Sequence, residues 1–89
     1  MADHYIGPAR LRLGAHGETT RRVTLQAIGQ SGWRGMIVDG PTSELVDGIV
    51  EVTLLDGEDR GKTATASMVM RGEPGQAYLQ GHAPFGARP

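Results

Sequence analysis

The sequence predicts an all-β protein, a single small antiparallel barrel or sandwich of about six strands in meander order. Three features of its 89 residues indicate this fold. Several short segments alternate apolar and polar residues with a period of two, as strands with one buried face do. Turn clusters rich in Gly and Pro separate these segments. Segments with helical periodicity are too short to form a stable helix alone.

The first two predicted strands are Ala9–Leu13 and Arg22–Ala27, with a loop at Gly14–Glu18 between them. Apolar residues occupy odd-numbered positions in both strands, so an antiparallel hairpin buries one odd-numbered face. The expected cross-strand pairs are Leu13 with Val23 and Leu11 with Leu25.

A third strand is predicted at Trp33–Val38, after a turn at Gly29–Gly32. Gly35 inside this strand indicates a bulge or a bend. The turn cluster Asp39–Glu44 follows, and one helical turn is expected to open at Pro41 or Thr42.

The fourth strand, Gly48–Leu55, is rich in β-branched residues and is the most strand-prone segment. A hairpin loop at Asp56–Gly61 connects it to a fifth strand at Lys62–Met70. The expected pairs are Val50 with Met68, Val52 with Ala66, and Leu54 with Ala64. The residues expected to face water are Glu51, Thr53, Thr63, Thr65 and Ser67.

A turn at Arg71–Gly75 and a last strand at Gln76–Gly81 complete the domain, which we expect to span residues 1–85. Residues 86–89 are predicted to be a flexible tail. A six-stranded sheet with one apolar face must close on itself, form a sandwich or pair with another copy. Glycines within and beside the strands favour bending, and therefore a barrel.

Two small side chains, Ala64 and Ala66, are predicted to face the interior. They leave space either for Trp33 to pack across or for a cavity that binds a small apolar ligand. The candidate residues for such a ligand site are Trp33, Ala64, Ala66, Met68 and Met70.

Three arginines, Arg10, Arg12 and Arg22, share the outward face of the first two strands. Guanidinium groups bind carboxylates and phosphates through paired hydrogen bonds, so this face is a candidate site for an anionic partner. Edge protection and solubility are the alternative explanation.

Composition excludes several other chemistries. The sequence has no Cys, and its three His lack metal-ligand spacing, so we expect neither a disulfide nor a metal site. Neither a catalytic constellation nor a cofactor motif is found, and none is expected. A net charge of −1 and dispersed aromatic residues argue against nucleic-acid binding. The absence of a long apolar run and of a leader-like N-terminus predicts a cytoplasmic protein without a membrane span.

Four short segments of the chain are distinctive: Tyr5–Ala9, Arg22–Ile28, Gly32–Gly35 and Leu79–Phe85. Together they resemble a small actinobacterial domain of unknown function. That domain occurs alone or behind flavin-dependent monooxygenase-like domains. The resemblance implies a bacterial β domain accessory to redox or secondary-metabolic enzymes, and the preference for Arg over Lys also suggests a bacterial source.

These features predict a non-enzymatic β-barrel binding or accessory module. We expect a homo-oligomer, because a chain of this size buries only about 60–65% of its unfolded surface and gains stability from a partner. A protein partner is one expectation. The alternative is a barrel that binds a small apolar ligand in its interior, with cyclase- or isomerase-like activity.

Overall fold

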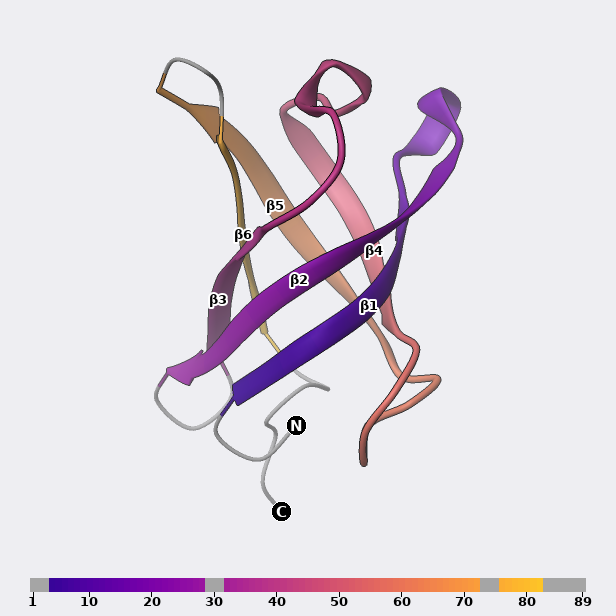
Figure 1. Cartoon of the computed structure of the whole chain (residues 1–89), viewed down its shortest axis with the longest axis vertical. Coiled ribbons are helices and arrows are strands. Elements are labelled where there is room, and N and C mark those ends of the chain that lie inside the picture. Colours follow the sequence, from indigo (N-terminus) through magenta and orange to yellow (C-terminus); the bar gives the residue numbers. More distant parts are fainter. Residues whose placement is uncertain (1–3, 29–31, 73–75, 83–89) are drawn as a thin grey trace.

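Six antiparallel strands close into one barrel in the order β1-β2-β3-β6-β5-β4 (Figure 1). The computed structural model describes residues 4–28, 32–72 and 76–82, apart from the side chain of Glu44. The strands are β1 (His4–Arg12), β2 (Glu18–Ile28), β3 (Gly32–Ile37), β4 (Gly48–Leu54), β5 (Thr63–Arg71) and β6 (Gln76–His82). Two short 3-10 turns are η1 (Gly14–His16) and η2 (Thr42–Glu44). The predicted all-β fold is confirmed, and the barrel is the form that it takes.

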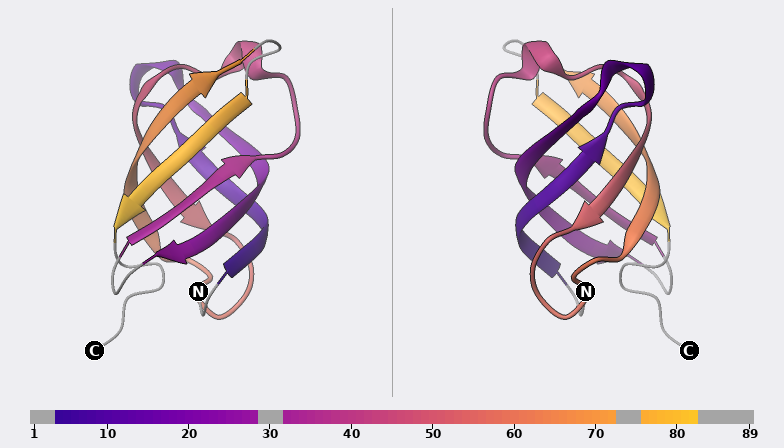
Figure 2. Two further views of the ribbon diagram at one scale, coloured as in Figure 1. Left: turned by 90° about the vertical axis from the view of Figure 1, so that its left-hand side faces the viewer. Right: turned by 90° about the vertical axis from the view of Figure 1, so that its right-hand side faces the viewer.

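The barrel consists of two three-stranded meanders, β1-β2-β3 and β4-β5-β6. They join where β3 pairs with β6 and where β1 pairs with β4. The connection from β3 to β4, residues 38–47, crosses one end of the barrel and contains η2 (Figure 2). The single helical turn expected near Pro41 is therefore present, as the 3-10 turn η2.

The core follows the predicted period of two. Alternate residues of every strand point inward and form one hydrophobic cluster. Its largest fully buried side chains are Trp33, Leu11, Leu25, Leu54, Met68, Leu79, Val23 and Val52. The odd-numbered faces of β1 and β2 and the even-numbered face of β5 are buried, as predicted.

The predicted pairing of the first hairpin is wrong. Leu11 lies opposite Thr19, and Val23 and Leu25 lie opposite Gly7 and Tyr5. The reason is the connection: η1 turns the chain tightly, so β2 begins at Glu18, directly opposite Arg12. The shift is an even number of residues, which is why the buried face was still predicted correctly.

Strand β1 also begins earlier than predicted, at His4, and runs through Pro8. Proline lacks the N–H group that a strand interior needs. The carbonyl of Pro8 accepts a hydrogen bond from the N–H of Leu55, so the missing N–H faces the β4 side. Pairing with β4 starts only at Ala9, and Pro8 is therefore accommodated.

The predicted pairing of β4 with β5 is wrong by two residues. Val50 lies opposite Ala66, and Val52 opposite Ala64. The connecting loop closes more tightly than predicted, because the N–H of Gly61, at φ 87°, donates back to the carbonyl of Leu54.

Thr53 was expected to face water and is instead buried, at 9% exposure. It stays on the outer face of the sheet, where its neighbours cover it. Its hydroxyl group shares a 2.7 Å hydrogen bond with that of Thr63 on β5.

Gly35 does not interrupt the ladder between β2 and β3, so the alternative of a bulge at this position is wrong. A Cβ atom at Gly35 would collide with the carbonyl oxygen of Thr24 and the backbone of Leu25. Glycine is therefore needed here for the close approach of two strands. The predicted turn residues 29–31 and 73–75 and the predicted tail 86–89 lie outside the described residues.

Two buried side chains, Arg21 and Tyr5, bring polar groups into the barrel. Arg21 points inward at 4% exposure, and its guanidinium donates to the hydroxyl of Thr19 and to the carbonyl of Asp39, each at 3.1 Å. These bonds attach the β3–β4 crossover to β2. The hydroxyl of Tyr5 donates to the carbonyl of Pro8 at 2.6 Å. Burial, helped by nearby Asp56, raises the pKa of Tyr5 above its ordinary value of 10.0.

Candidate functional site

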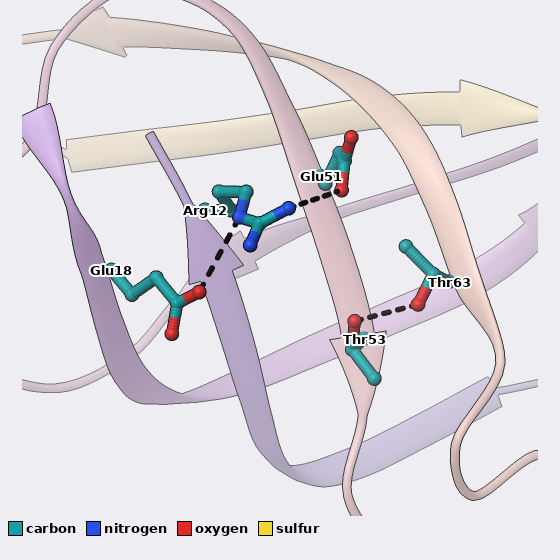
Figure 3. Close-up of polar contacts among 5 residues, drawn as sticks. All are labelled: Arg12, Glu18, Glu51, Thr53 and Thr63. Atoms are coloured by element: carbon teal, nitrogen blue, oxygen red, sulfur yellow. Dashed lines mark hydrogen bonds and ion pairs between the residues drawn. The ribbon is translucent and has the colours of Figure 1, made fainter. Parts of the chain in front are cut away.

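The predicted arginine face is partly neutralised in the fold. Arg12 lies between two carboxylates, with Nε 3.3 Å from Glu18 and Nη1 3.8 Å from Glu51 (Figure 3). Strand pairing explains the contact, because Glu18 on β2 and Glu51 on β4 are the direct neighbours of Arg12. Both sides of each ion pair are about half exposed, so each pair adds little stability.

Arg10 and Arg22 are exposed and lie near each other on the same surface. Arg10 has Thr20 and Thr53 as its cross-strand neighbours, and Arg22 lies opposite Pro8. Arg22 therefore sits one diagonal step from Arg10, at a Cα separation of about 7–8 Å. The fold brings the three predicted arginines together, but two acids share that surface with them.

The predicted interior residues gather in the core. Trp33, Ala64, Ala66 and Met68 are buried, and Met70 packs partly against them. The indole Nε1 of Trp33 donates to the carbonyl of His82 at 2.8 Å. A Cβ atom on Gly81 would lie 2.5 Å from Cζ2 of Trp33. The indole therefore fills the space beside Gly81.

A hollow lies on the outer wall, over β2, β3, β6 and β5. We call it the outer groove, and its volume is about 660 Å³. Its lining residues are Thr24, Leu25, Gln26, Arg34, Gly35, Met36, Ser67, Val69, Arg71, Tyr78, Leu79 and Gln80. Volumes of about 300–1,000 Å³ are typical of small-molecule sites.

Cross-strand pairing builds this groove from two parallel rows of outward side chains. The central row runs from β5 to β2 and consists of Val69, Tyr78, Met36 and Thr24. The polar row beside it consists of Ser67, Gln80, Arg34 and Gln26. Neighbours within a row have Cα atoms about 4.5–5.5 Å apart, so each row is continuous. The groove thus presents an apolar strip beside a hydrogen-bonding strip.

Tyr78 is the centre of the apolar strip, with 42% of its surface exposed. Tyr78 is paired with Val69 on β5 and with Met36 on β3. An exposed aromatic ring among aliphatic neighbours offers a flat surface for an apolar group, and its hydroxyl remains available for a hydrogen bond.

The charge of the groove is positive. Arg34 and Arg71 line it, and the described lining holds no carboxylate. No ion pair joins either guanidinium to an acidic residue in the part of the chain that the structure describes. This distinguishes the pair from Arg12, which two carboxylates already neutralise.

The described residues contain no group of three or more His, Asp or Glu side chains that could hold a metal ion. Within residues 4–28, 32–72 and 76–82, no helix is long and apolar enough to cross a membrane. The groove offers guanidinium and amide groups that can donate hydrogen bonds, and amide and hydroxyl oxygens that can accept them.

Comparison with known proteins gives no relative. Models of protein families, curated proteins and solved structures were searched, and none matches the chain. The resemblance to an actinobacterial domain stays a prediction.

Sequence reasoning missed the outer groove because its residues come from four strands. One signal was present: Met36, Val69 and Tyr78 are apolar residues at outward positions, where most outward neighbours are polar. Their alignment in one row becomes visible only when the register is known.

Proposed function

We propose that the chain is a non-enzymatic binding module whose functional surface is the outer groove, and that its ligand is an organic anion with an apolar part. One observation carries the proposal. Arg34 and Arg71, neither of them paired with a described acid, line one groove with an exposed tyrosine.

Physical chemistry supports this pairing of ligand and surface. Exposed guanidinium groups attract carboxylates, sulfonates and phosphates, and charge-assisted hydrogen bonds fix their position. The strip of Val69, Tyr78 and Met36 covers the apolar part of the ligand and removes that surface from water. Because the groove lies open on the outer wall, we expect weak, salt-dependent binding rather than tight capture.

Naphthalene-2-sulfonate is a suitable probe, because it joins one anionic group to a flat apolar ring. We expect a two-dimensional NMR titration to give a saturable dissociation constant at low salt. The variant Arg34→Gln/Arg71→Gln should weaken binding by at least threefold. Arg10→Gln is the matched control, since Arg10 is also exposed and lies outside the groove. Equal affinity of wild type and the double variant would refute the proposal.

We further propose that the module self-associates, as its small core suggests. Ile49 on β4 and Ile6 on β1 support this, since 69% and 58% of their surfaces are exposed. Ile49 lies opposite Ser67, at the border of the groove. Sedimentation velocity should show a dimer or larger species, and Ile49→Ser should shift it toward monomer. A wild-type monomer at micromolar concentration would refute self-association without affecting the groove.

A further inference from the structure

We infer that the outer groove recognises an extended acidic peptide in which two carboxylates flank an apolar side chain, in the order acid–x–apolar–x–acid. The inference rests on the proposed function and deepens it, because it assigns the partner. The positions of Arg34, Tyr78 and Arg71 carry it.

These three residues lie on one diagonal of the sheet. On β6, Tyr78 is flanked along the outer face by Gln80 and Gln76. Arg34 of β3 pairs with Gln80, and Arg71 of β5 pairs with Gln76. The two arginines therefore stand on opposite sides of Tyr78, each one diagonal step away. A diagonal step is about 7–8 Å between Cα atoms, so the guanidinium-bearing residues are roughly 15 Å apart.

An extended peptide has a matching period. It rises about 3.3 Å per residue, and alternate side chains point to the same side. Side chains at positions i, i+2 and i+4 thus lie on one face and span about 13 Å. When the middle side chain rests on Tyr78, the outer two reach Arg34 and Arg71, whose flexible side chains make up the small difference in length.

The groove lining supplies partners for the peptide backbone as well. Gln80 and Gln26 flank Arg34 in the polar row, and Ser67 ends that row. Their amide and hydroxyl groups both donate and accept hydrogen bonds. The barrel is closed, so the peptide cannot add a strand to a free edge. Recognition then depends on side chains, and the spacing of the charges becomes the main determinant of affinity.

A compact anion fits this arrangement less well. A single carboxylate or sulfonate binds one arginine. The second arginine, roughly 15 Å away, then has no anionic group of the ligand to bind. Only a ligand with two separated anionic groups uses both arginines at once. Charge complementarity therefore favours the acidic peptide over a small monoanion.

The test uses two peptides of equal composition and charge. The first is acetyl-Gly-Asp-Ser-Leu-Ser-Asp-Gly-amide, which has the required spacing. The second, acetyl-Gly-Asp-Asp-Leu-Ser-Ser-Gly-amide, places the two acids side by side. Dissociation constants come from NMR titration of the full chain at low salt. We expect the first peptide to bind at least threefold more tightly than the second.

Single variants sharpen the result. Arg34→Gln and Arg71→Gln should each weaken binding of the first peptide by roughly two- to fivefold, as expected for exposed ion pairs. Tyr78→Ser should also weaken it, and Arg10→Gln should not. Equal affinity for the two peptides, or dependence on only one of the two arginines, would overturn the inference.

The naphthalene-2-sulfonate titration separates this failure from failure of the proposed function. If that probe binds the groove and the two peptides do not differ, the groove is a binding surface but the peptide assignment is wrong. If neither probe nor peptide binds, both are wrong. If a dimer interface covers the groove, a peptide that binds there must compete with dimerisation. A dimer that neither peptide displaces at any concentration would therefore also overturn the inference.

Discussion

Replacing Gly81 with alanine should destabilise the barrel strongly for a change of one methyl group. The new Cβ would lie 2.5 Å and 2.7 Å from Cζ2 and Cε2 of Trp33, and 3.0 Å from the carbonyl oxygen of Thr65. The indole is fully buried, and its Nε1 is held by the carbonyl of His82 at 2.8 Å. The ring therefore cannot move aside without losing that hydrogen bond.

The size of the effect follows from these contacts. Overfilling a tightly packed core costs about 1–3 kcal/mol. Loss of a buried hydrogen bond adds about 1 kcal/mol. We therefore expect Gly81→Ala to lower the free energy of unfolding by about 2–4 kcal/mol, a large fraction of the total stability of a small domain.

Urea unfolding followed by far-UV circular dichroism measures this change, since the peptide backbone dominates that signal. The double variant Gly81→Ala/Trp33→Phe is the control. Its smaller ring should accept the methyl group, so the two substitutions should cost less together than the sum of their separate costs. A loss below about 0.5 kcal/mol in the single variant would mean that the interior beside Trp33 is not filled, and would strengthen the interior-ligand hypothesis.

Four further predictions concern other parts of the barrel. Tyr5 has a raised pKa, so the unfolded state loses this proton first, and stability should fall as the pH rises above about 10. Between pH 9 and pH 11, the free energy of unfolding measured with urea should fall less in Tyr5→Phe than in wild type. Equal falls would contradict the raised pKa of Tyr5 as their cause. Arg12→Gln should cost less than about 1 kcal/mol, with a cost that shrinks in 1 M NaCl, because both ion pairs are exposed. Arg21→Ala should lower the free energy of unfolding by about 1.5–3 kcal/mol and should speed amide hydrogen exchange in the crossover at residues 38–47. Unchanged exchange in the crossover of this variant would contradict the role of Arg21 as its anchor. Ala66→Trp should prevent folding, as judged by loss of the strand signal in circular dichroism, whereas a folded variant would indicate unfilled space around Ala66.

The sequence was sufficient to predict the inward face of β1, β2, β4 and β5, with Thr53 as the exception. Period-two alternation is a local property, and Leu11 and Leu13, or Ala64 and Ala66, identify the inward face without knowledge of their partners. The same reasoning predicted six strands with an apolar face that must be covered by a barrel, a sandwich or another copy, and only the glycines favoured the barrel.

Pairing depends on information that alternation does not contain. The register of β1 and β2 is set by the tight turn η1, and that of β4 and β5 by the bond from Gly61 to Leu54. Both predicted registers were shifted by an even number of residues, so the buried faces were still correct and the cross-strand neighbours were not. Arg21 shows a related limit. It lies before the predicted second strand, and only the fold places it inward, where the crossover supplies the carbonyl of Asp39 for its guanidinium.

The candidate site was missed for the same reason. Arg10, Arg12 and Arg22 are conspicuous in the sequence because they are close along the chain, and the fold then places Glu18 and Glu51 beside Arg12. Arg34 and Arg71 are far apart in the sequence, and strand pairing brings them to opposite sides of Tyr78. Cross-strand neighbours decide which charges remain available to a ligand.

The most direct test of the outer groove is the map of amide chemical-shift changes when naphthalene-2-sulfonate is added to the wild-type protein. We predict that the largest changes fall on Arg34, Met36, Tyr78 and Gln80, with small changes at Arg10 and Arg12. Changes concentrated on β1 around Arg10 and Arg12, or spread evenly over the barrel, would contradict the claim that the outer groove is the binding surface.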